Sequence, residues 1–429
     1  MCRYTSSLRT KWSAVPRYSL HLVLLFAFGV RALAAVGLES TLERRGERFL
    51  FGDTEGYLIL AEQIRHARPY EFGAAEARVV RMPGFPLLLA AILCVFGDNV
   101  LIIRLVLAAV GTLACGLLYV LGRRLFDHRV GLLAAGGAAV YPTFVLFSVV
   151  VLSETWFVVL MLANLIGLAR VAQGPPNDHP PSGASKTEEQ TDWPALVCGI
   201  LAGAATLVRP SWLLFSPALM AARVAVGPHR RRALRQAVFL LAGMAAIMAP
   251  WWARNYRATG RFVPTTLWVG ASLYDGLNPN ATGGSDMRFM PEVKAKRLGE
   301  VEQDRYLRQE AIRFARENPR RALELAGLKF LRYWSPWPHA EQFQGWPAGL
   351  VLLFSYGPAL GLAVAGLWRQ RGQGWTLALL VMPVMYFCLI HLIFASSIRY
   401  RLPGMYPLMV LAATALVSPR PRLSRGARP

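Results

Sequence analysis

The strongest constraint on this chain is a succession of long apolar segments separated by short clusters of arginine and lysine. About 20 apolar helical residues cross the roughly 30 Å hydrocarbon core of a bilayer. Hydrophobic residues occupy 54% of the 429 positions, more than is usual in a soluble protein of this size. We therefore predict an all-α polytopic membrane protein with about ten transmembrane helices. The candidate spans are Tyr18 to Leu38, Val100 to Leu121, Val130 to Val150, Trp156 to Ala172, Pro194 to Val208, Trp212 to Val226, Val238 to Trp252, Gly345 to Leu367, Trp375 to Ala395 and Leu402 to Val417.

The segment Pro83 to Phe96 is ambiguous, because its 14 residues rise only about 21 Å as a helix. We interpret it as a re-entrant or interfacial helix that does not cross. The basic clusters Arg123-Arg124, His229 to Arg232 and Arg369 to Arg371 then fall on the same side as the basic N-terminus. This is the distribution that the positive-inside rule predicts. If the segment crossed, several of these clusters would face outward.

The formal net charge of +22 arises from the same clusters, which form no basic face on a soluble module. We therefore expect a lipid bilayer, and no nucleic acid, as the partner of these charges. The predicted location is the cytoplasmic membrane of a bacterium. The first apolar segment is either a retained anchor or a cleaved signal peptide with Ala32-Leu33-Ala34 as the cleavage motif. Arg31 is expected to extend toward the outer interface.

Polar and apolar stretches divide the chain into six parts. We predict an N-terminal membrane module over 1–172 with a first outer loop over 39–99, a flexible cytoplasmic linker over 173–192, central transmembrane helices over 193–253, an extracytoplasmic helical segment over 254–345, C-terminal transmembrane helices over 346–418 and a basic cytoplasmic tail over 419–429. Within the outer segment, Glu292 to Glu317 is predicted to be one amphipathic helix. Asn318-Pro319 is expected to open a second helix that ends near Trp334.

The five cysteines and seven histidines are scattered and offer no disulfide framework or zinc spacing. No cofactor is therefore predicted with certainty. Asp53 and Glu154 carry hard oxygen ligands that suit Mg²⁺ or Mn²⁺, so a divalent cation stays open.

Charged residues gather where the apolar segments meet the predicted outer face. Ionisable groups at a membrane boundary are costly unless they are paired or functional. Their number on one face therefore predicts a site there. The residues are Asp53 and Glu55 in the first outer loop, Arg81 before the short apolar segment, Glu154, Arg209 before a proline, and Arg399 and Arg401 on either side of Tyr400.

Several motifs in fixed order resemble the GT-C glycosyltransferases, in particular family 39 with its protein O-mannosyltransferase and aminoarabinose-transferase-like members. The likeness extends from about residue 18 to 418. The motifs are Asp53 with Tyr57, Arg81-Met-Pro-Gly-Phe-Pro86, Arg123-Arg124-Leu-Phe126, Ser153-Glu-Thr155, Val208-Arg-Pro210, Lys329-Phe-Leu-Arg-Tyr-Trp334 and Arg399-Tyr-Arg-Leu-Pro403.

The resemblance implies an inverting transfer of a sugar from a polyprenyl-phosphate donor to an extracytoplasmic acceptor, which is a protein, lipid or glycan. It implies that Asp53 is the catalytic base or positions the acceptor, and Glu154 is the second catalytic candidate. In the family a second acid often stands directly beside this Asp, whereas here Thr54 separates Asp53 from Glu55. The expected substrate-binding residues are Glu55, Tyr57, Arg81, Arg209, Arg399, Tyr400 and Arg401.

Elementary chemistry agrees with these implied roles, because a carboxylate can take the proton of an attacking hydroxyl and arginine binds phosphate through a planar fork. Structural alternatives remain for several residues. Asp53 is also a favourable helix N-cap, Glu154 a possible structural partner of an arginine, and Arg81 and Arg401 possible interface anchors. The rival functions are a transporter or flippase without chemistry, and a silent relative that only binds the lipid-linked sugar.

Overall fold

The structure is a computed structural model that describes residues 19–72, 77–173, 192–227, 229–339, 343 and 345–417. Within these residues the regular elements are helices, as the sequence predicts. They are α1 (Ser19–Arg45), α2 (Asp53–Arg65), α3 (Gly84–Phe96), α4 (Val100–Leu125), α5 (His128–Val140), α6 (Pro142–Phe147), α7 (Glu154–Gln173), α8 (Trp193–Val208), η1 (Pro210–Trp212), α9 (Phe215–Val226), α10 (Arg230–Thr259), α11 (Val269–Gly276), η2 (Met287–Phe289), α12 (Met290–Ala295), α13 (Glu300–Glu317), α14 (Pro319–Trp334), α15 (Trp346–Arg369), α16 (Gly374–Ile393) and α17 (Ile398–Leu416).

Six of these helices are long and apolar enough to cross a membrane: α1, α4, α7, α10, α15 and α16. Shorter apolar helices accompany them, namely α3, α8 and the segment Pro210–Val226. The chain is thus a multi-pass, all-α membrane protein, while the count of ten spans stays a prediction. Most of the predicted linker and the tail over 419–429 lie outside the described residues, and the other domain boundaries also stay predictions.

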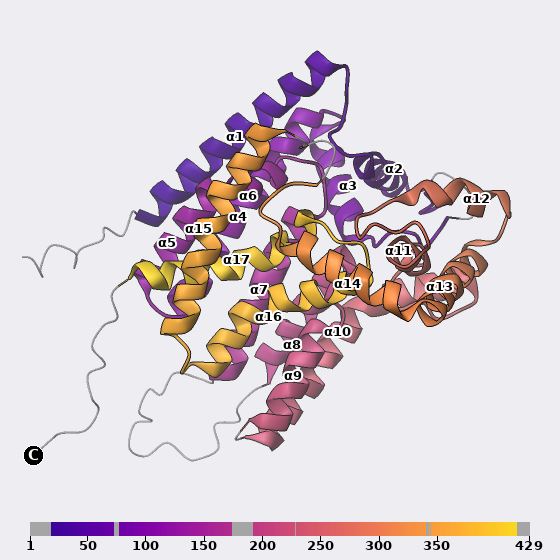
Figure 1. Ribbon diagram of the computed structural model, residues 1–429. Helices are drawn as coiled ribbons and strands as arrows, with labels where there is room; N and C mark the ends of the chain where they lie inside the picture. The colour runs from indigo at the N-terminus through magenta and orange to yellow at the C-terminus, as the bar shows by residue number, and fades with distance from the viewer. Residues whose placement is uncertain are drawn as a thin grey trace, which may run out of the picture.

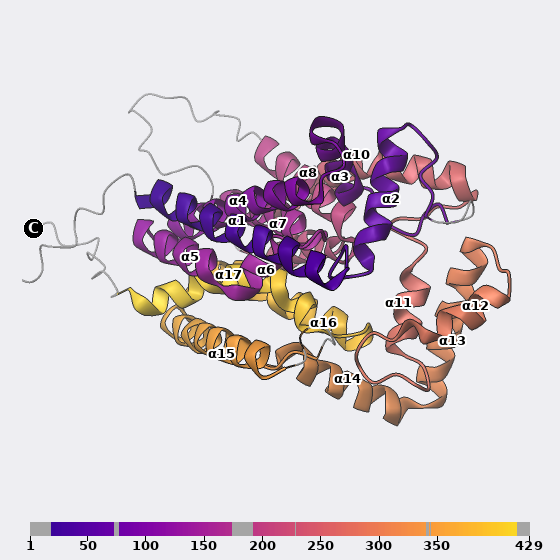
Figure 2. The same ribbon diagram turned by 90° about the horizontal axis from the view of Figure 1, so that it is seen from above.

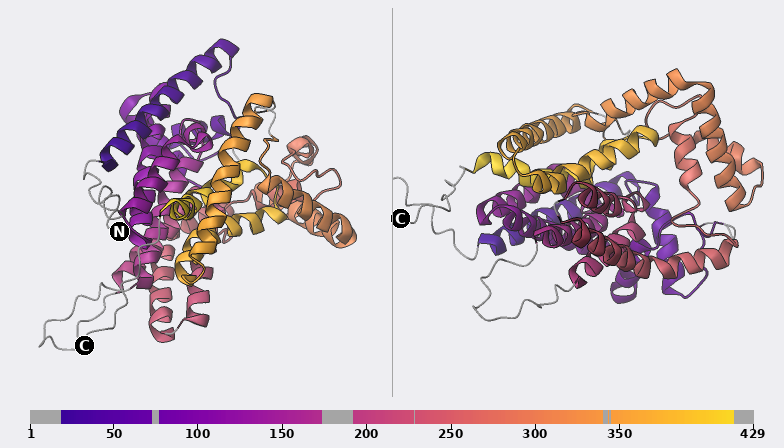
Figure 3. Two further views of the ribbon diagram at one scale, coloured as in Figure 1. Left: turned by 60° about the vertical axis from the view of Figure 1, so that its left-hand side comes forward. Right: turned by 90° about the horizontal axis from the view of Figure 1, so that it is seen from below.

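The long helices form a bundle with two different ends. Figures 1 and 2 show α2, α11, α12 and α13 at one end, opposite the end where α1 begins and α17 terminates. The helices α11 to α14 project from the bundle, as Figure 3 shows in two further views. We call the end that carries them the outer end.

The α2–α3 segment begins and ends at the outer end. Arg104 Nε, near the start of α4, lies 2.6 Å from Glu39 Oε2, near the end of α1. The Arg104 guanidinium also donates to the Val149 carbonyl, 3.1 Å away. Since this ion pair joins the exit of α1 to the entry of α4, the chain between them returns to the end at which it emerged. The geometry agrees with a Pro83 to Phe96 segment that does not cross.

Small residues permit close packing between α8 and α10. A β-carbon on Gly199 would lie 1.9 Å from the Leu240 carbonyl oxygen, and one on Gly243 would lie 2.1 Å from that of Leu196. Glycine is therefore required at both positions, since nothing larger fits against the opposing backbone. The predicted span Val238 to Trp252 lies within the longer α10, which extends further in both directions.

A buried amide joins α7, α8 and η1. The Asn164 side chain donates to the Cys198 carbonyl at 2.9 Å and accepts from Trp212 Nε1 at 3.3 Å and Ser216 Oγ at 2.8 Å. Such satisfied networks fix the relative position of helices where no water is available. The helix found in the predicted span Trp212 to Val226 is shorter than expected, because Trp212 belongs to η1 and α9 begins at Phe215.

The predicted continuous span Val130 to Val150 is wrong. Helix α5 ends at Val140, and the short α6 begins at Pro142. Proline has no N–H and restricts the residue before it to extended backbone, which here is Tyr141 with ψ 116°. The Arg31 guanidinium donates to the carbonyls of Ala139 and Ala138, at 3.2 and 3.0 Å.

Arg31 is therefore a buried capping residue. Its side chain has no exposed surface, so the expectation that it extends to the outer interface is wrong. The guanidinium satisfies carbonyl groups that the break after α5 leaves without helical partners.

The outer segment is helical, but Glu292 to Glu317 is not one helix. Helix α12 ends at Ala295, the chain turns, and α13 starts at Glu300 after Gly299. Arg297 within this turn has a positive φ of 51°, which interrupts a helix. The predicted second helix is confirmed as α14, with Pro319 in its first turn. The Asn318 side chain makes no N-cap hydrogen bond and donates backward to the Phe314 carbonyl at 3.2 Å.

Candidate functional site

Asp53 is the first residue of α2 and lies at the outer end of the bundle. The adjacent Thr54 is buried and donates its hydroxyl to the Val151 carbonyl at 3.0 Å. This bond fixes the start of α2 against the segment that leads into α7, whose first residue is Glu154. Thr54, which separates the two acids in the sequence, thus determines where the Asp53 carboxylate lies.

Arg81 reaches Asp53 from an irregular segment that the outer helices hold in place. The backbone N–H groups of Arg78 and Val79 donate to the Glu300 carboxylate at 3.0 and 2.7 Å. Further along, a β-carbon on Gly84 would lie 2.7 Å from the Leu207 carbonyl oxygen, so α3 starts directly against the end of α8. The close approach brings the Arg81 segment next to the Arg209 region.

Two carboxylates and three guanidiniums form one chain of ion pairs, which we call the outer charge cluster: Asp53, Arg81, Glu154, Arg209 and Arg399. Arg81 Nη2 lies 2.8 Å from Asp53 Oδ1, and Arg399 Nη1 lies 3.0 Å from Asp53 Oδ2. Arg399 also donates its Nε to Glu154 Oε1. Arg209 Nη1 lies 3.3 Å from the same oxygen. The sequence prediction that these residues meet is confirmed by these contacts.

The cluster retains unused hydrogen-bonding capacity. Glu154 Oε2 and Arg209 Nη1 are buried and have no hydrogen-bond partner within the described part of the chain, although the Arg209 atom is close to Glu154. Buried polar atoms are normally satisfied. An acceptor and a donor left open at the same place therefore mark a position where a polar ligand can bind.

The two carboxylates differ in accessibility. The side chain of Asp53 is 39% exposed, whereas that of Glu154 is fully buried. Asp53 can therefore meet a molecule that arrives from outside, and Glu154 lies beneath it with Arg399 between them.

The cluster has one net positive charge when all five groups are ionised. Burial raises the pKa of Asp53, but the charges and hydrogen bonds of Arg399 and Arg81 outweigh this and lower it to about 2. Asp53 is consequently ionised at neutral pH, and the surplus of guanidinium groups suits an anionic ligand.

The remaining predicted residues of this region lie around the cluster in different roles. Tyr57 presents its ring to the Arg81 guanidinium, 4.6 Å from the ring centroid. Tyr400 stacks in parallel on the His391 ring with centroids 4.2 Å apart, and Arg209 lies 6.0 Å from the Tyr400 ring. Glu55 is exposed and makes no ion pair or hydrogen bond among the described residues. Its assignment as a substrate-binding residue stays a prediction.

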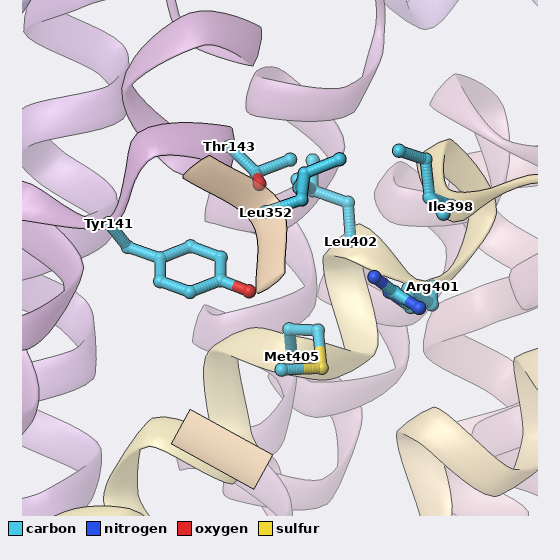
Figure 4. Close-up of a pocket in the computed structure, with 7 residues that line it drawn as sticks. All are labelled: Tyr141, Thr143, Leu352, Ile398, Arg401, Leu402 and Met405. Atoms are coloured by element: carbon cyan, nitrogen blue, oxygen red, sulfur yellow. The ribbon is translucent and has the colours of Figure 1, made fainter. Parts of the chain in front are cut away.

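Arg401 lies apart from the cluster. It donates to the Tyr333 and Ser335 carbonyls at 2.8 and 2.6 Å, and its guanidinium lies 3.7 Å from the Tyr356 ring centroid. Figure 4 shows it beside a cavity of about 10 Å³, hardly larger than one water molecule. These contacts give Arg401 a structural role, since they tie α17 to the end of α14.

Three residues of the site were not predicted from the sequence: Thr54, Glu300 and His391. The first two act through backbone groups distant in the chain, and nothing in their local sequence indicates this. His391 donates its Nδ1–H to the Ala395 carbonyl at 2.8 Å, which leaves Nε2 as an acceptor beside Tyr400. The sequence signal that could have indicated His391 is its position as a single histidine at the end of an apolar segment.

The carboxylates named as possible metal ligands do not fit a resident divalent ion. Asp53 and Glu154 are both bonded to Arg399, so a guanidinium occupies the position between them. The described residues contain no group of three Asp, Glu, His or Cys side chains suited to a metal. A divalent cation is not confirmed, and no step of the chemistry is assigned to one.

Comparison with known proteins supports the fold. Residues 80–253 match the family model "Dolichyl-phosphate-mannose-protein mannosyltransferase". No curated protein matches the chain by sequence.

Among solved structures, the Archaeoglobus fulgidus oligosaccharyltransferase in the apo form superposes with a TM-score of 0.57 at 17% identity, over 94% of this chain and 51% of that one. The same organism's AglB, in complex with an inhibitory peptide and a dolichol-phosphate, gives 0.56 at 15% identity, over 93% and 49%. The Archaeoglobus fulgidus oligosaccharyltransferase in complex with Zn and sulfate superposes with a TM-score of 0.53 at 16% identity, over 93% of this chain and 48% of that one.

The chain therefore spans about half the length of these solved oligosaccharyltransferases. The match covers nearly all of the present chain, so the shared part includes its whole membrane bundle. At this level of identity the likeness establishes the fold. The fold that the resemblance implies is thus confirmed: the chain has a GT-C-like membrane fold, and its 80–253 segment matches the protein mannosyltransferase family model.

Proposed function

We propose that the protein is an inverting membrane glycosyltransferase that moves a sugar from a polyprenyl-phosphate donor to an extracytoplasmic acceptor. The observation that carries the proposal is the accessible Asp53 carboxylate held between Arg81 and Arg399. Such an arrangement places a proton acceptor beside binding groups for a phosphate. The family match to a mannosyltransferase model, and the dolichol-phosphate bound by the related AglB, support the class of donor.

In the proposed reaction the acceptor hydroxyl attacks the anomeric carbon and gives its proton to Asp53. The new bond joins the acceptor oxygen to this carbon, while the bond from the carbon to the donor phosphate oxygen breaks with both electrons. The leaving phosphate gains negative charge, and Arg399, Arg81 and Arg209 stabilise it. Attack opposite the departing phosphate inverts the anomeric configuration.

Donor binding also changes the pKa of Asp53, the proposed base. With a pKa of about 2, Asp53 has little affinity for a proton while both guanidiniums are bonded to it. A phosphate that draws Arg399 and Arg81 away neutralises part of their charge, so the pKa of Asp53 rises toward its ordinary value.

We place the protein in the cytoplasmic membrane of a bacterium with the outer charge cluster on the extracytoplasmic side. The basic turns at the opposite end of the bundle support this orientation. The acceptor approaches from the outer end of the bundle, where the partly exposed Asp53 begins α2.

The test is turnover by the purified protein in nanodiscs with a polyprenyl-phosphate sugar and extracts of envelope acceptors. Asp53→Asn keeps the shape but removes the basic oxygen, and we expect the rate to fall by roughly 10² to 10⁴. The matched control is Glu55→Gln in the same helix, for which a smaller change is expected. Wild-type turnover by a folded Asp53→Asn protein would contradict the assignment. Movement of intact donor lipid without sugar transfer would favour the transporter.

A further inference from the structure

A large apolar pocket lies between α9 and α16, away from the outer charge cluster. Its volume is about 760 Å³, and apolar side chains form most of its wall. Leu389 and Met382 line it and are 60% and 49% exposed on the surface of the bundle. Because α16 is long and apolar enough to cross a membrane, these exposed apolar residues suit contact with lipid, and a hydrocarbon chain can enter the pocket from the side.

One end of the pocket is cationic. Arg223 lines it, and Arg232 is near enough for its charge to act on Arg223. Arg223 Nη1 donates to Gln236 Oε1 at 2.6 Å, and its guanidinium lies 5.7 Å from the Trp375 ring. These partners are neutral, and within the described chain neither arginine forms an ion pair. Among the described residues, the positive charge at this end of the pocket is thus not compensated by an acid.

Two donors at the same end have no partner among the residues that the structure describes. Trp375 Nε1 and Arg232 Nε are buried and lack a hydrogen-bond acceptor within the described residues. Trp375 itself lines the pocket. Unsatisfied buried N–H groups are unusual and indicate that an acceptor normally lies nearby. An apolar wall that ends in open donors and arginine is the pattern expected for a lipid with a phosphate headgroup.

The cationic end is the one far from the outer charge cluster. Helix α9 follows Arg209 and reaches Arg223 near its end, and α16 runs from Trp375 toward the start of α17. From Trp375 to Ile393, the rise along α16 is about 27 Å, close to the thickness of the hydrocarbon core. A lipid whose phosphate sat at the outer charge cluster would direct its apolar tail at Arg223. The charges favour a lipid that enters with its headgroup at the inner end.

We propose that this pocket binds an anionic phospholipid of the inner leaflet. Its phosphate contacts Arg223, Arg232 and Trp375 Nε1, and an acyl chain lies along α9 and α16 toward Tyr386. The site is separate from the proposed sugar transfer and does not depend on it.

The experiment is native mass spectrometry of the full-length protein, delipidated in neutral detergent and titrated with phosphatidylglycerol or phosphatidylcholine. We expect phosphatidylglycerol to bind more tightly. Arg223→Gln and Arg232→Gln should each weaken it on the order of tenfold, as the loss of a charged hydrogen bond implies. Trp375→Phe keeps the ring and removes the N–H, so it should weaken binding less. The control Arg371→Gln removes an exposed arginine of the turn before α16 and should change nothing.

Thermal unfolding of each variant without added lipid shows whether it is folded. If an arginine variant is not folded, the Trp375→Phe variant still tests the proposal. Equal binding of the two phospholipids, or unchanged phosphatidylglycerol binding in the folded arginine and Trp375 variants, would overturn the proposal. So would displacement of phosphatidylglycerol by millimolar inorganic phosphate, which would identify a free-anion site. Displacement by undecaprenyl phosphate, with an affinity that Arg223→Gln leaves unchanged, would assign the pocket to the donor chain.

Discussion

Arg399 lies between the two carboxylates of the outer charge cluster and bonds to both. Removing it would leave Glu154 as a fully buried charge with only the longer contact to Arg209. Loss of one partner from a buried ion pair typically costs about 3 to 5 kcal/mol. Arg399 therefore contributes to stability as well as to the proposed phosphate binding, and its variants alone cannot separate the two.

Variants of Arg209 separate the effect on stability from the effect on phosphate binding better, because Glu154 keeps its bond to Arg399 when Arg209 is changed. We expect Arg209→Ala to weaken binding of a polyprenyl-phosphate sugar by about tenfold to a hundredfold, the value of a hydrogen bond to a charged group. Arg209→Lys keeps the charge without the planar fork and should fall between alanine and wild type. Binding in nanodiscs is the measurement, and Arg261→Ala at an exposed outer position is the control. Unchanged affinity in Arg209→Ala would reduce Arg209 to an interface anchor.

The meeting of Asp53, Arg81, Glu154 and Arg399 could be predicted because each lies where an apolar segment reaches the outer face. Arg401 shows the limit of this reasoning. Successive helical residues turn by about 100°, so side chains two apart point to different faces. Arg399 therefore faces Asp53, and Arg401 faces Tyr333 and Ser335.

Among the elements, the α2–α3 segment determines the topology of everything that follows. Single cysteines at Glu47 and Asp98, on its two sides, should both react with a membrane-impermeant thiol reagent in intact cells. Both positions are exposed, and the Arg104–Glu39 ion pair places their neighbours at the same end of the bundle. A cysteine at Arg371 should be protected, in a background without the native cysteines. Labelling of Glu47→Cys with protection of Asp98→Cys would show that α3 crosses.

Hydropathy predicted where apolar helices occur better than where they stop. The break after α5 was detectable in principle from Tyr141-Pro142, but the apolar character continues across it to Val150. The opposite error occurred outside the membrane, where one amphipathic pattern spans α12 and α13 although the backbone turns at Arg297. Periodicity reports which face is apolar, and it carries little information on a local turn.

At the scale of the whole molecule, the outer segment is attached to the bundle by contacts that no local pattern predicts. Glu300 holds the backbone of Arg78 and Val79, more than two hundred residues away. Lys329 of α14 donates to the last carbonyls of α16, Ile393 and Leu392, at 2.6 and 3.2 Å. These contacts depend on tertiary folding, which explains why the sequence indicated an outer helical segment but not how it docks.

The buried Lys329 makes stability depend on pH. Burial lowers its pKa from 10.5 to about 8, although Asp275 partly opposes the shift. The unfolded chain thus binds more protons between about pH 8 and 10.5, and stability should rise with pH across this window. The gain is at most about 3 kcal/mol. Melting temperatures in detergent at pH 8 and 10 are the measurement, and Lys329→Met should remove this component. A wild-type protein that loses stability as much as Lys329→Met over this range would contradict the prediction.

The saturation of Asp53 by two arginines has a consequence for the sequence of events in one catalytic cycle. Before the donor arrives, an arginine contacts each carboxylate oxygen of Asp53 and holds its pKa low, so Asp53 is a weak acceptor for the hydrogen bond and the proton of an acceptor hydroxyl. Transfer should accordingly follow a compulsory order, with the lipid-linked sugar first and the acceptor second. An unreactive acceptor analogue should then inhibit uncompetitively with respect to the donor, because it binds only the donor complex. Noncompetitive inhibition would indicate that the acceptor binds the empty protein as well. Under compulsory order, excess acceptor cannot bind the protein that lacks donor. The supply of lipid-linked sugar alone therefore determines when a cycle begins.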